Sequence, residues 1–218
     1  MSIEEKLDLE EINKGFVKKE SKERIKWAYE TFKEGLFLTT SGGNTSAVLP
    51  DLTREALGFC PPIIFVDTGY FNECTHNMLK YLEKEGYDIK IFKSLISKKE
   101  IEEKYPGWSD PESDYFDKVV SIIKHEPLNI GLKELKVKAW LGGIMRHETE
   151  ERKKADFVQY IKGLYQVFPI LDWDDCKINE YLMFNKLPVN QYHFDITKGP
   201  DQKRECNIWK ECGIKRKD

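Results

Sequence analysis

The stretch of sequence best suited to covalent chemistry is its C-terminal end, KRECNIWKECGIKRKD, residues 203–218. Cys212 lies there between Lys210 and the basic run Lys215–Lys217. Nearby cations stabilise a thiolate, the form of cysteine that attacks electrophiles, so we predict that Cys212 is a nucleophile. An idle surface thiol is the alternative. Cys206, six residues earlier, is a possible second thiol that resolves or pairs with Cys212.

A cluster of small polar residues follows the apolar segment LFLTT and opens a predicted helix. The cluster contains Thr40, Ser41, Gly42, Gly43 and Ser46. Backbone N–H groups at a glycine turn and at a helix N-terminus favour negative charge, and hydroxyl groups add further donors. We therefore predict a phosphate-binding loop, with a tight turn and an ordinary serine cap as the alternative.

Two more polar segments follow predicted strands. Asp67, Thr68 and Gly69 end the apolar run IIFVD, where a carboxylate would bind a ribose hydroxyl, an adenine amino group or a magnesium ion, or simply cap the next helix. Arg146 and Arg152 follow a later strand, and paired guanidinium groups supply planar donors for phosphate or sulfate. For the arginines, the alternative is a solvated charge run paired with neighbouring glutamates.

The elements that would position these residues alternate along the chain. We predict five strands, at residues 36–40, 63–68, 88–94, 138–144 and 165–171. We predict helices over 4–34, 46–57, 72–86, 114–123, 127–135 and 174–185, and a loop at 104–114.

This alternation predicts an α/β fold with a doubly wound, mostly parallel five-stranded sheet flanked by helices. Ligands of such folds lie beyond the C-terminal ends of the strands, where the polar clusters fall. We expect one α/β domain over residues 1–197, including N-terminal helices, and a mobile basic C-terminal tail over 198–218 that carries Cys206 and Cys212.

Composition excludes several classes of protein. The net charge of −3 and the pI near 5.9 argue against nucleic-acid binding. No apolar run approaches the ~20 residues that span a bilayer, and the acidic N-terminus does not resemble a secretory signal. We therefore expect a cytoplasmic protein without a membrane partner.

The cysteines and histidines give no sign of a metal site. The five cysteines are odd in number and include no Cys-x-x-Cys or Cys-Cys pair, which argues against a disulfide framework, a zinc ribbon and an iron–sulfur cluster. We expect Cys60, Cys74 and Cys176 to pack in the core. The four histidines show no metal-ligand spacing, so we assign no metal.

Taken together, these residues resemble the phosphoadenosine-phosphosulfate (PAPS) reductase family, within the adenine nucleotide α-hydrolase (PP-loop) superfamily. The resemblance runs from about residue 30 to residue 214. It rests on the segments IIFVDTGYF, IIKHEPLNIGLKEL, AWLGGIMRHETEER, FPILDWDDCKINEYL and ECGI. It implies that residues 1–197 form an adenine nucleotide α-hydrolase-like domain and that the tail carries the catalytic cysteine.

The resemblance also implies a reaction. Cys212 would attack the sulfate sulfur of PAPS, form an S-sulfocysteine and release adenosine 3′,5′-bisphosphate, after which a thioredoxin- or glutaredoxin-type dithiol would free sulfite. The 41–46 loop and Asp67–Gly69 would bind adenosine and phosphates, and Lys124, Arg146 and Arg152 would hold the phosphosulfate. No tightly bound cofactor and no iron–sulfur cluster are implied, and a homodimer is one open possibility.

Some features depart from the family pattern and motivate two other hypotheses. SGGNTS (41–46) is closer to the Ser-Gly-Gly-x-Asp-Ser loop of ATP pyrophosphatases, with Thr45 in place of Asp. The second hypothesis is therefore an ATP-dependent sulfur-inserting enzyme that uses ATP with magnesium, adenylates a carrier-bound acceptor, releases pyrophosphate and takes sulfur from a donor. Glu148 stands where the family tends to have Gln, and the segment between Tyr192 and Glu211 is shorter than usual. These departures motivate a third hypothesis, a non-catalytic nucleotide-binding module.

Overall fold

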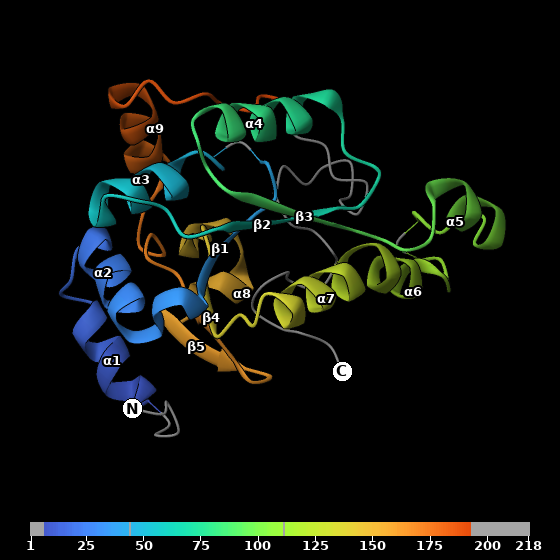
Figure 1. Ribbon diagram of the computed structural model, residues 1–218. Helices are drawn as coiled ribbons and strands as arrows, with labels where there is room; N and C mark the ends of the chain where they lie inside the picture. Colours follow the sequence, from blue (N-terminus) through green and yellow to red (C-terminus); the bar gives the residue numbers. More distant parts are fainter. Residues whose placement is uncertain (1–6, 44, 111, 193–218) are drawn as a thin grey trace.

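The computed structural model describes residues 7–43, 45–110 and 112–192 (Figure 1). A six-stranded sheet in the order β3-β2-β1-β4-β6-β5 forms its centre. The strands are β1 Leu36–Thr40, β2 Ile63–Asp67, β3 Ile89–Lys93, β4 Ala139–Leu141, β5 Val158–Ile161 and β6 Leu164–Val167. β5 is antiparallel to β6, and the other pairings are parallel. The predicted doubly wound, mostly parallel α/β fold is confirmed.

The predicted number of strands was wrong, because β5 forms an edge hairpin that the sequence analysis missed. Lys162 and Gly163 connect β5 to β6 with φ angles of 51° and 81°, the left-handed conformation that tight two-residue hairpins need. β5 is short and partly exposed, so it lacks the continuous apolar run of a central strand. β6 in turn ends at Val167, before a turn in which the Leu171 N–H donates to the Phe168 carbonyl.

The helices differ from the predictions mainly at the N-terminus and before the 104–114 loop. They are α1 Leu9–Phe16, α2 Ser21–Phe32, α3 Val48–Leu57, α4 Glu73–Lys84, α5 Lys98–Lys104, α6 Phe116–Val120, α7 Glu126–Glu134, α8 Glu150–Lys153 and α9 Asp175–Phe184, with the short turns η1 Lys33–Gly35, η2 Ser121–His125 and η3 Arg146–Glu148. The predicted 4–34 helix is two helices, because Glu20 and Glu23 form a capping box that starts α2 anew. α5 was missed, although Ser97 and Glu100 form a capping box at its start.

Helices cover both faces of the sheet. Figure 1 shows α3, α4 and α9 on one side and α6 and α7 on the other. On β1, Leu38 faces the larger core with α2, α3, α4 and α9, whereas Phe37 faces a second core with α7. Burial on both faces is what makes the central strands read as uninterrupted apolar runs. Within the described part of the chain, no helix is both long enough and apolar enough to cross a membrane.

Candidate active site

A cavity of about 170 Å³ lies at the C-terminal ends of β1 and β4. Thr39 and Thr40 of β1 line one wall, and Gly142 and Gly143, which follow β4, line another. The chain leaves β1 toward β2 and leaves β4 toward the opposite edge of the sheet, so this is the topological switch point. Open α/β sheets bind their ligands at this point.

Five of the predicted binding residues line this cavity. They are Thr40, Ser41, Ser46, Lys124 and Arg152. They come from the end of β1, the loop after it, the η2 turn and α8, so the fold brings together residues more than 100 positions apart in the chain.

The loop after β1 has a conformation that only glycine adopts readily at one position. Gly42 has a φ of 70°, and a Cβ atom there would lie 2.6 Å from the methyl carbon of Thr75 in α4. The Gly42 N–H donates to Thr40 Oγ1 at 3.2 Å. The first glycine of the cluster is therefore required for the close approach of the loop to α4.

Lys124 reaches the cavity from the π-helical turn η2, which joins α6 to α7. Pro127 has no N–H, so it cannot donate to the Ile123 carbonyl as a residue in a regular α-helix would. The Glu126 N–H donates to the Ser121 carbonyl, five residues back, which is the hydrogen bond of a π-helical turn. The wider turn places Lys124 at the cavity with 9% of its surface exposed. The predicted helix over 127–135 corresponds to α7, which starts at Glu126 with Pro127 in its first turn and follows η2 without a break.

Arg152 supplies the second buried cation of the cavity, with 2% of its surface exposed. Its Nη1 pairs with Glu148 Oε2, and the same carboxylate oxygen accepts a hydrogen bond from the Met145 N–H at 2.8 Å. The Arg152 N–H donates to Thr149 Oγ1 at 3.0 Å. Arg152 is thus held in place by the turn that precedes α8.

The remaining walls of the cavity are largely apolar. Trp140 and Phe168 line it from the sheet side, Phe71 from the segment after β2, and Leu128 from α7. The flat faces of the aromatic side chains can pack against a planar base, and the aliphatic side chains complete an apolar wall. The two buried cations can bind anionic groups attached to that base. The sequence analysis missed these apolar residues, because each of them resembles an ordinary core residue in the sequence.

The other predicted binding residues are not among those that line the cavity. Asp67 accepts a hydrogen bond from the Gly69 N–H at 2.9 Å and pairs with Lys93 Nζ of β3 at 3.1 Å. Thr68 Oγ1 accepts from the Tyr70 N–H at 3.4 Å. These contacts shape the turn after β2, and binding of adenosine by Asp67–Gly69 stays a prediction.

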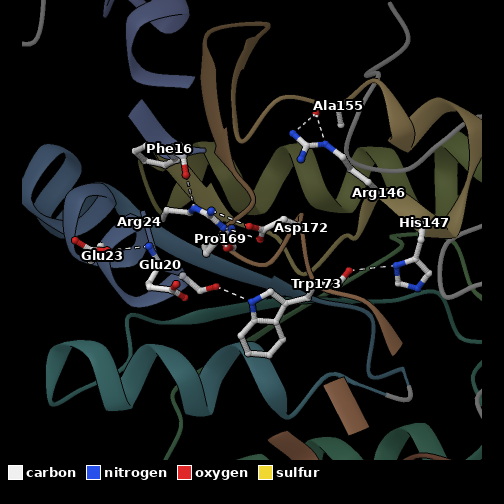
Figure 2. Close-up of polar contacts among 11 residues, drawn as sticks. Phe16, Glu20, Glu23, Arg24, Arg146, His147, Ala155, Pro169, Asp172 and Trp173 are labelled. Carbon is white, nitrogen blue, oxygen red and sulfur yellow. Dashed lines mark hydrogen bonds and ion pairs between the residues drawn. The ribbon is translucent and has the colours of Figure 1, made fainter. Parts of the chain in front are cut away.

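Arg146 is not among the residues that line the cavity. Its Nε and Nη2 donate to the Ala155 carbonyl at 3.3 and 3.1 Å, as Figure 2 shows. Its guanidinium also lies 4.7 Å from the centre of the Phe157 ring. The structure therefore does not bring Arg146 and Arg152 together as a guanidinium pair.

Asn190 is a buried residue near the cavity that the sequence analysis did not identify. Its Nδ2 donates to the Gly42 carbonyl at 2.7 Å and to Thr75 Oγ1 at 3.3 Å. A single asparagine in the loop after α9 gives no sequence signal of such a contact.

None of the three described cysteines lines the cavity. Cys60 packs against the larger core, and burial raises the pKa of its thiol to about 12. Cys176 is exposed, so the prediction that it packs in the core was wrong. Cys206 and Cys212 lie outside the described residues. In residues 7–43, 45–110 and 112–192, no group of three His, Cys, Asp or Glu side chains is placed to hold a metal ion.

Comparison with known proteins identifies the family. The model of the phosphoadenosine phosphosulfate reductase domain matches residues 35–196. The phosphoadenosine 5′-phosphosulfate reductase of a Synechococcus strain is 33% identical over 187 residues, which cover 85% of this chain and 79% of the relative. The protein of that name from Proteus mirabilis is 32% identical over 196 residues, covering 88% and 79%.

A solved structure shares the fold. The PAPS reductase from Candida auris, solved as a phosphate complex, superposes with a TM-score of 0.72 at 23% identity, covering 84% of this chain and 88% of its own. The family match extends over all six strands and over each cavity residue named above. The chain therefore belongs to the phosphoadenosine phosphosulfate reductase domain family.

Proposed function

We propose that this protein reduces PAPS to sulfite and adenosine 3′,5′-bisphosphate. The observation that carries the proposal is the cavity itself, in which the charged lining residues among the described part of the chain, Lys124 and Arg152, are both cations. A buried site with two cations and apolar walls favours an anionic nucleotide over a neutral or cationic ligand. Membership of the family makes the chain an enzyme of the sulfonucleotide reductase type.

The cavity residues have separate roles in this proposal. Lys124 and Arg152 hold the phosphosulfate, and the hydroxyl groups of Ser41 and Ser46 donate to phosphate oxygens. The apolar wall that contains Trp140 packs against the adenine. Support for these roles comes from the burial of both cations, because a buried charge in contact with its ligand is not screened by water.

The chemical step is assigned to Cys212. Its thiolate attacks the sulfur of the phosphosulfate, the new S–S bond forms as the S–O bond to phosphate breaks, and the leaving phosphate oxygen takes the electron pair. The products are an S-sulfocysteine and adenosine 3′,5′-bisphosphate. A thioredoxin- or glutaredoxin-type dithiol of the cytoplasm then attacks the Cys212 sulfur, releases sulfite and closes to its own disulfide, so the dithiol supplies both electrons.

Sulfite production tests the reaction directly. Purified protein with PAPS and reduced thioredoxin should release sulfite, and Cys212→Ser should abolish this release while leaving the circular dichroism spectrum unchanged. Cys206→Ser is the matched control, since it removes a thiol from the same stretch of sequence, and it should retain most of the activity. Absence of sulfite with the wild-type protein, or full activity of Cys212→Ser, would rule out the proposed reaction.

Calorimetric titration tests the nucleotide. The wild-type protein should bind PAPS and adenosine 3′,5′-bisphosphate more tightly than ATP. Lys124→Met should weaken binding of adenosine 3′,5′-bisphosphate by about tenfold or more, because each buried charge-assisted bond contributes roughly 1.5–3 kcal/mol. Lys133→Met changes an exposed lysine of α7 and should have no effect. Preferential binding of ATP would favour the ATP-dependent alternative instead.

A further inference from the structure

We propose that Asn190 is a positioning residue for the nucleotide-binding loop after β1. The proposal rests on the function proposed above, which identifies the nucleotide that the loop would bind. Asn190 comes from the segment that follows α9, whereas the loop follows β1, so the two are 148 positions apart in the sequence. They meet in the structure beside the N-terminus of α4.

Every hydrogen-bonding group of the Asn190 side chain is used. The amide nitrogen donates to the Gly42 carbonyl at 2.7 Å and to Thr75 Oγ1 at 3.3 Å, and Oδ1 accepts from the Tyr192 N–H at 3.3 Å. Asn190 itself is buried. A fully bonded, buried carboxamide has one favourable position, so it fixes the groups that it contacts.

The contact with Gly42 controls the direction of a neighbouring donor. Gly42 has positive φ, and its own N–H is already bonded to Thr40 Oγ1. The peptide that joins Gly42 to Gly43 is planar and trans, so the Gly43 N–H points opposite to the Gly42 carbonyl. Holding that carbonyl against Asn190 therefore sets the direction of the Gly43 N–H, one of the donors that a phosphate-binding loop offers.

A second contact secures the same arrangement from the α4 side. Asn72 caps α4 by accepting from the Thr75 N–H at 3.1 Å, and its Nδ2 donates to the Tyr192 carbonyl. Thr75 is buried, and its methyl group contacts the space that a Gly42 side chain would occupy. The loop, the start of α4 and the segment after α9 are thus held as one unit, and we infer that loss of Asn190 releases the loop.

The test compares two asparagines that hold distant segments together. Asn190→Leu removes the carboxamide and keeps the volume. Asn13→Leu is the matched control, because the Asn13 amide donates to the Leu9 and Val158 carbonyls at 2.8 and 2.9 Å and does not line the cavity. In titrations with adenosine 3′,5′-bisphosphate, Asn190→Leu should raise Kd at least about tenfold, whereas Asn13→Leu should raise it less than twofold. We expect the two variants to lose similar amounts of melting temperature, so a difference in Kd would not reflect a difference in stability. In sulfite assays KM should rise with kcat nearly unchanged.

A Kd for Asn190→Leu within twofold of the wild-type value would overturn the proposal, since Asn190 would then be structural only. If Asn190→Leu does not fold, Thr75→Val is the variant that tests the proposal, because it removes one acceptor of the Asn190 amide and keeps the shape of the side chain. A severalfold rise in the Kd of Thr75→Val supports the proposal, and an unchanged Kd overturns it.

The proposed function and the role of Asn190 can fail separately. If the wild-type protein binds ATP and not adenosine 3′,5′-bisphosphate, the proposed function is wrong, and ATP titrations of the same variants still decide the role of Asn190. Amide hydrogen exchange of the loop peptide in the ligand-free proteins gives a readout without any nucleotide. Faster exchange in Asn190→Leu than in Asn13→Leu supports the positioning role, and equal exchange rates contradict it.

Discussion

Replacing Arg24 by methionine should lower the melting temperature of this protein by about 10 °C. The Arg24 guanidinium is buried and pairs through two bonds of 2.7 and 2.8 Å with Asp172 (Figure 2). It also donates to the Phe16 and Pro169 carbonyls at 3.0 and 2.8 Å. Arg24 thereby joins α2 to the segment after β6, which contributes two residues to the cavity wall.

The magnitude follows from the groups that lose a partner. Methionine fills similar volume and donates nothing, so two carbonyl groups lose a donor at about 1 kcal/mol each. The contact of the guanidinium with the Phe157 ring, at 4.0 Å, adds about 1 kcal/mol. The Asp172 side chain is 40% exposed and regains water, so we discount the ion pair to roughly 1 kcal/mol. A loss of about 4 kcal/mol corresponds to about 8–16 °C for a chain of this length.

The same pair should also make stability depend on acid pH. Burial opposes ionisation of Asp172, but hydrogen bonds and charge from Arg24 outweigh burial and hold the pKa of Asp172 below its usual value. A carboxyl group with a lowered pKa stabilises the folded state above its unfolded pKa, and this stabilisation is lost as the pH falls through the folded pKa. The difference in stability between wild type and Arg24→Met should therefore shrink below about pH 4.

Differential scanning calorimetry from pH 3 to pH 7 measures both effects. Lys14→Met is the control, because Lys14 forms an exposed pair with Glu10 at 2.6 Å and its loss should change the melting temperature by less than about 2 °C. The reasoning fails if Arg24→Met melts within 2 °C of wild type at pH 7, or if its deficit is the same at pH 3 as at pH 7.

Three further substitutions test the loop, the cavity and the sheet. In chemical denaturation, Gly42→Ala should lower the free energy of unfolding by roughly 2 kcal/mol more than Gly58→Ala does. Both glycines have positive φ, but only an alanine at position 42 would meet a methyl carbon at 2.6 Å, so equal losses would contradict the packing argument. Glu148→Gln keeps the hydrogen-bond acceptor and removes the negative charge beside Arg152, so titration should show roughly fivefold tighter binding of adenosine 3′,5′-bisphosphate, about 1 kcal/mol; weaker binding would show that the charge is needed to hold the arginine. Gln166→Leu should raise the melting temperature by about 2–4 °C, because the fully buried carboxamide has no hydrogen-bond partner within the described structure and its desolvation costs about 1 kcal/mol or more; a lower melting temperature would indicate a partner for this side chain.

Most of the central sheet was predictable from the sequence. β1 and β2 are buried on both faces, so their apolar runs are continuous and end in polar residues at the C-terminal edge. The edge hairpin was not predictable in this way, since β5 is half exposed and its pattern is set by pairing with β6. Residue type therefore identified strands buried on both faces, and tertiary pairing decided the strand at the edge.

The candidate site was likewise predictable from the sequence only in part. Residue types alone predicted that small polar residues and cations follow the strands of a parallel sheet, because turn and anion-binding chemistry depends on residue type and local order. Which cation enters the cavity depends on tertiary packing: Arg152 is held there by Glu148, whereas Arg146 donates to Ala155, which does not line it. The contacts of Asn190 depend on tertiary packing too, since its partners lie far away in the chain. The direction of a long side chain, and the partners of a buried amide, depend on packing between distant segments, which no local pattern in the sequence encodes.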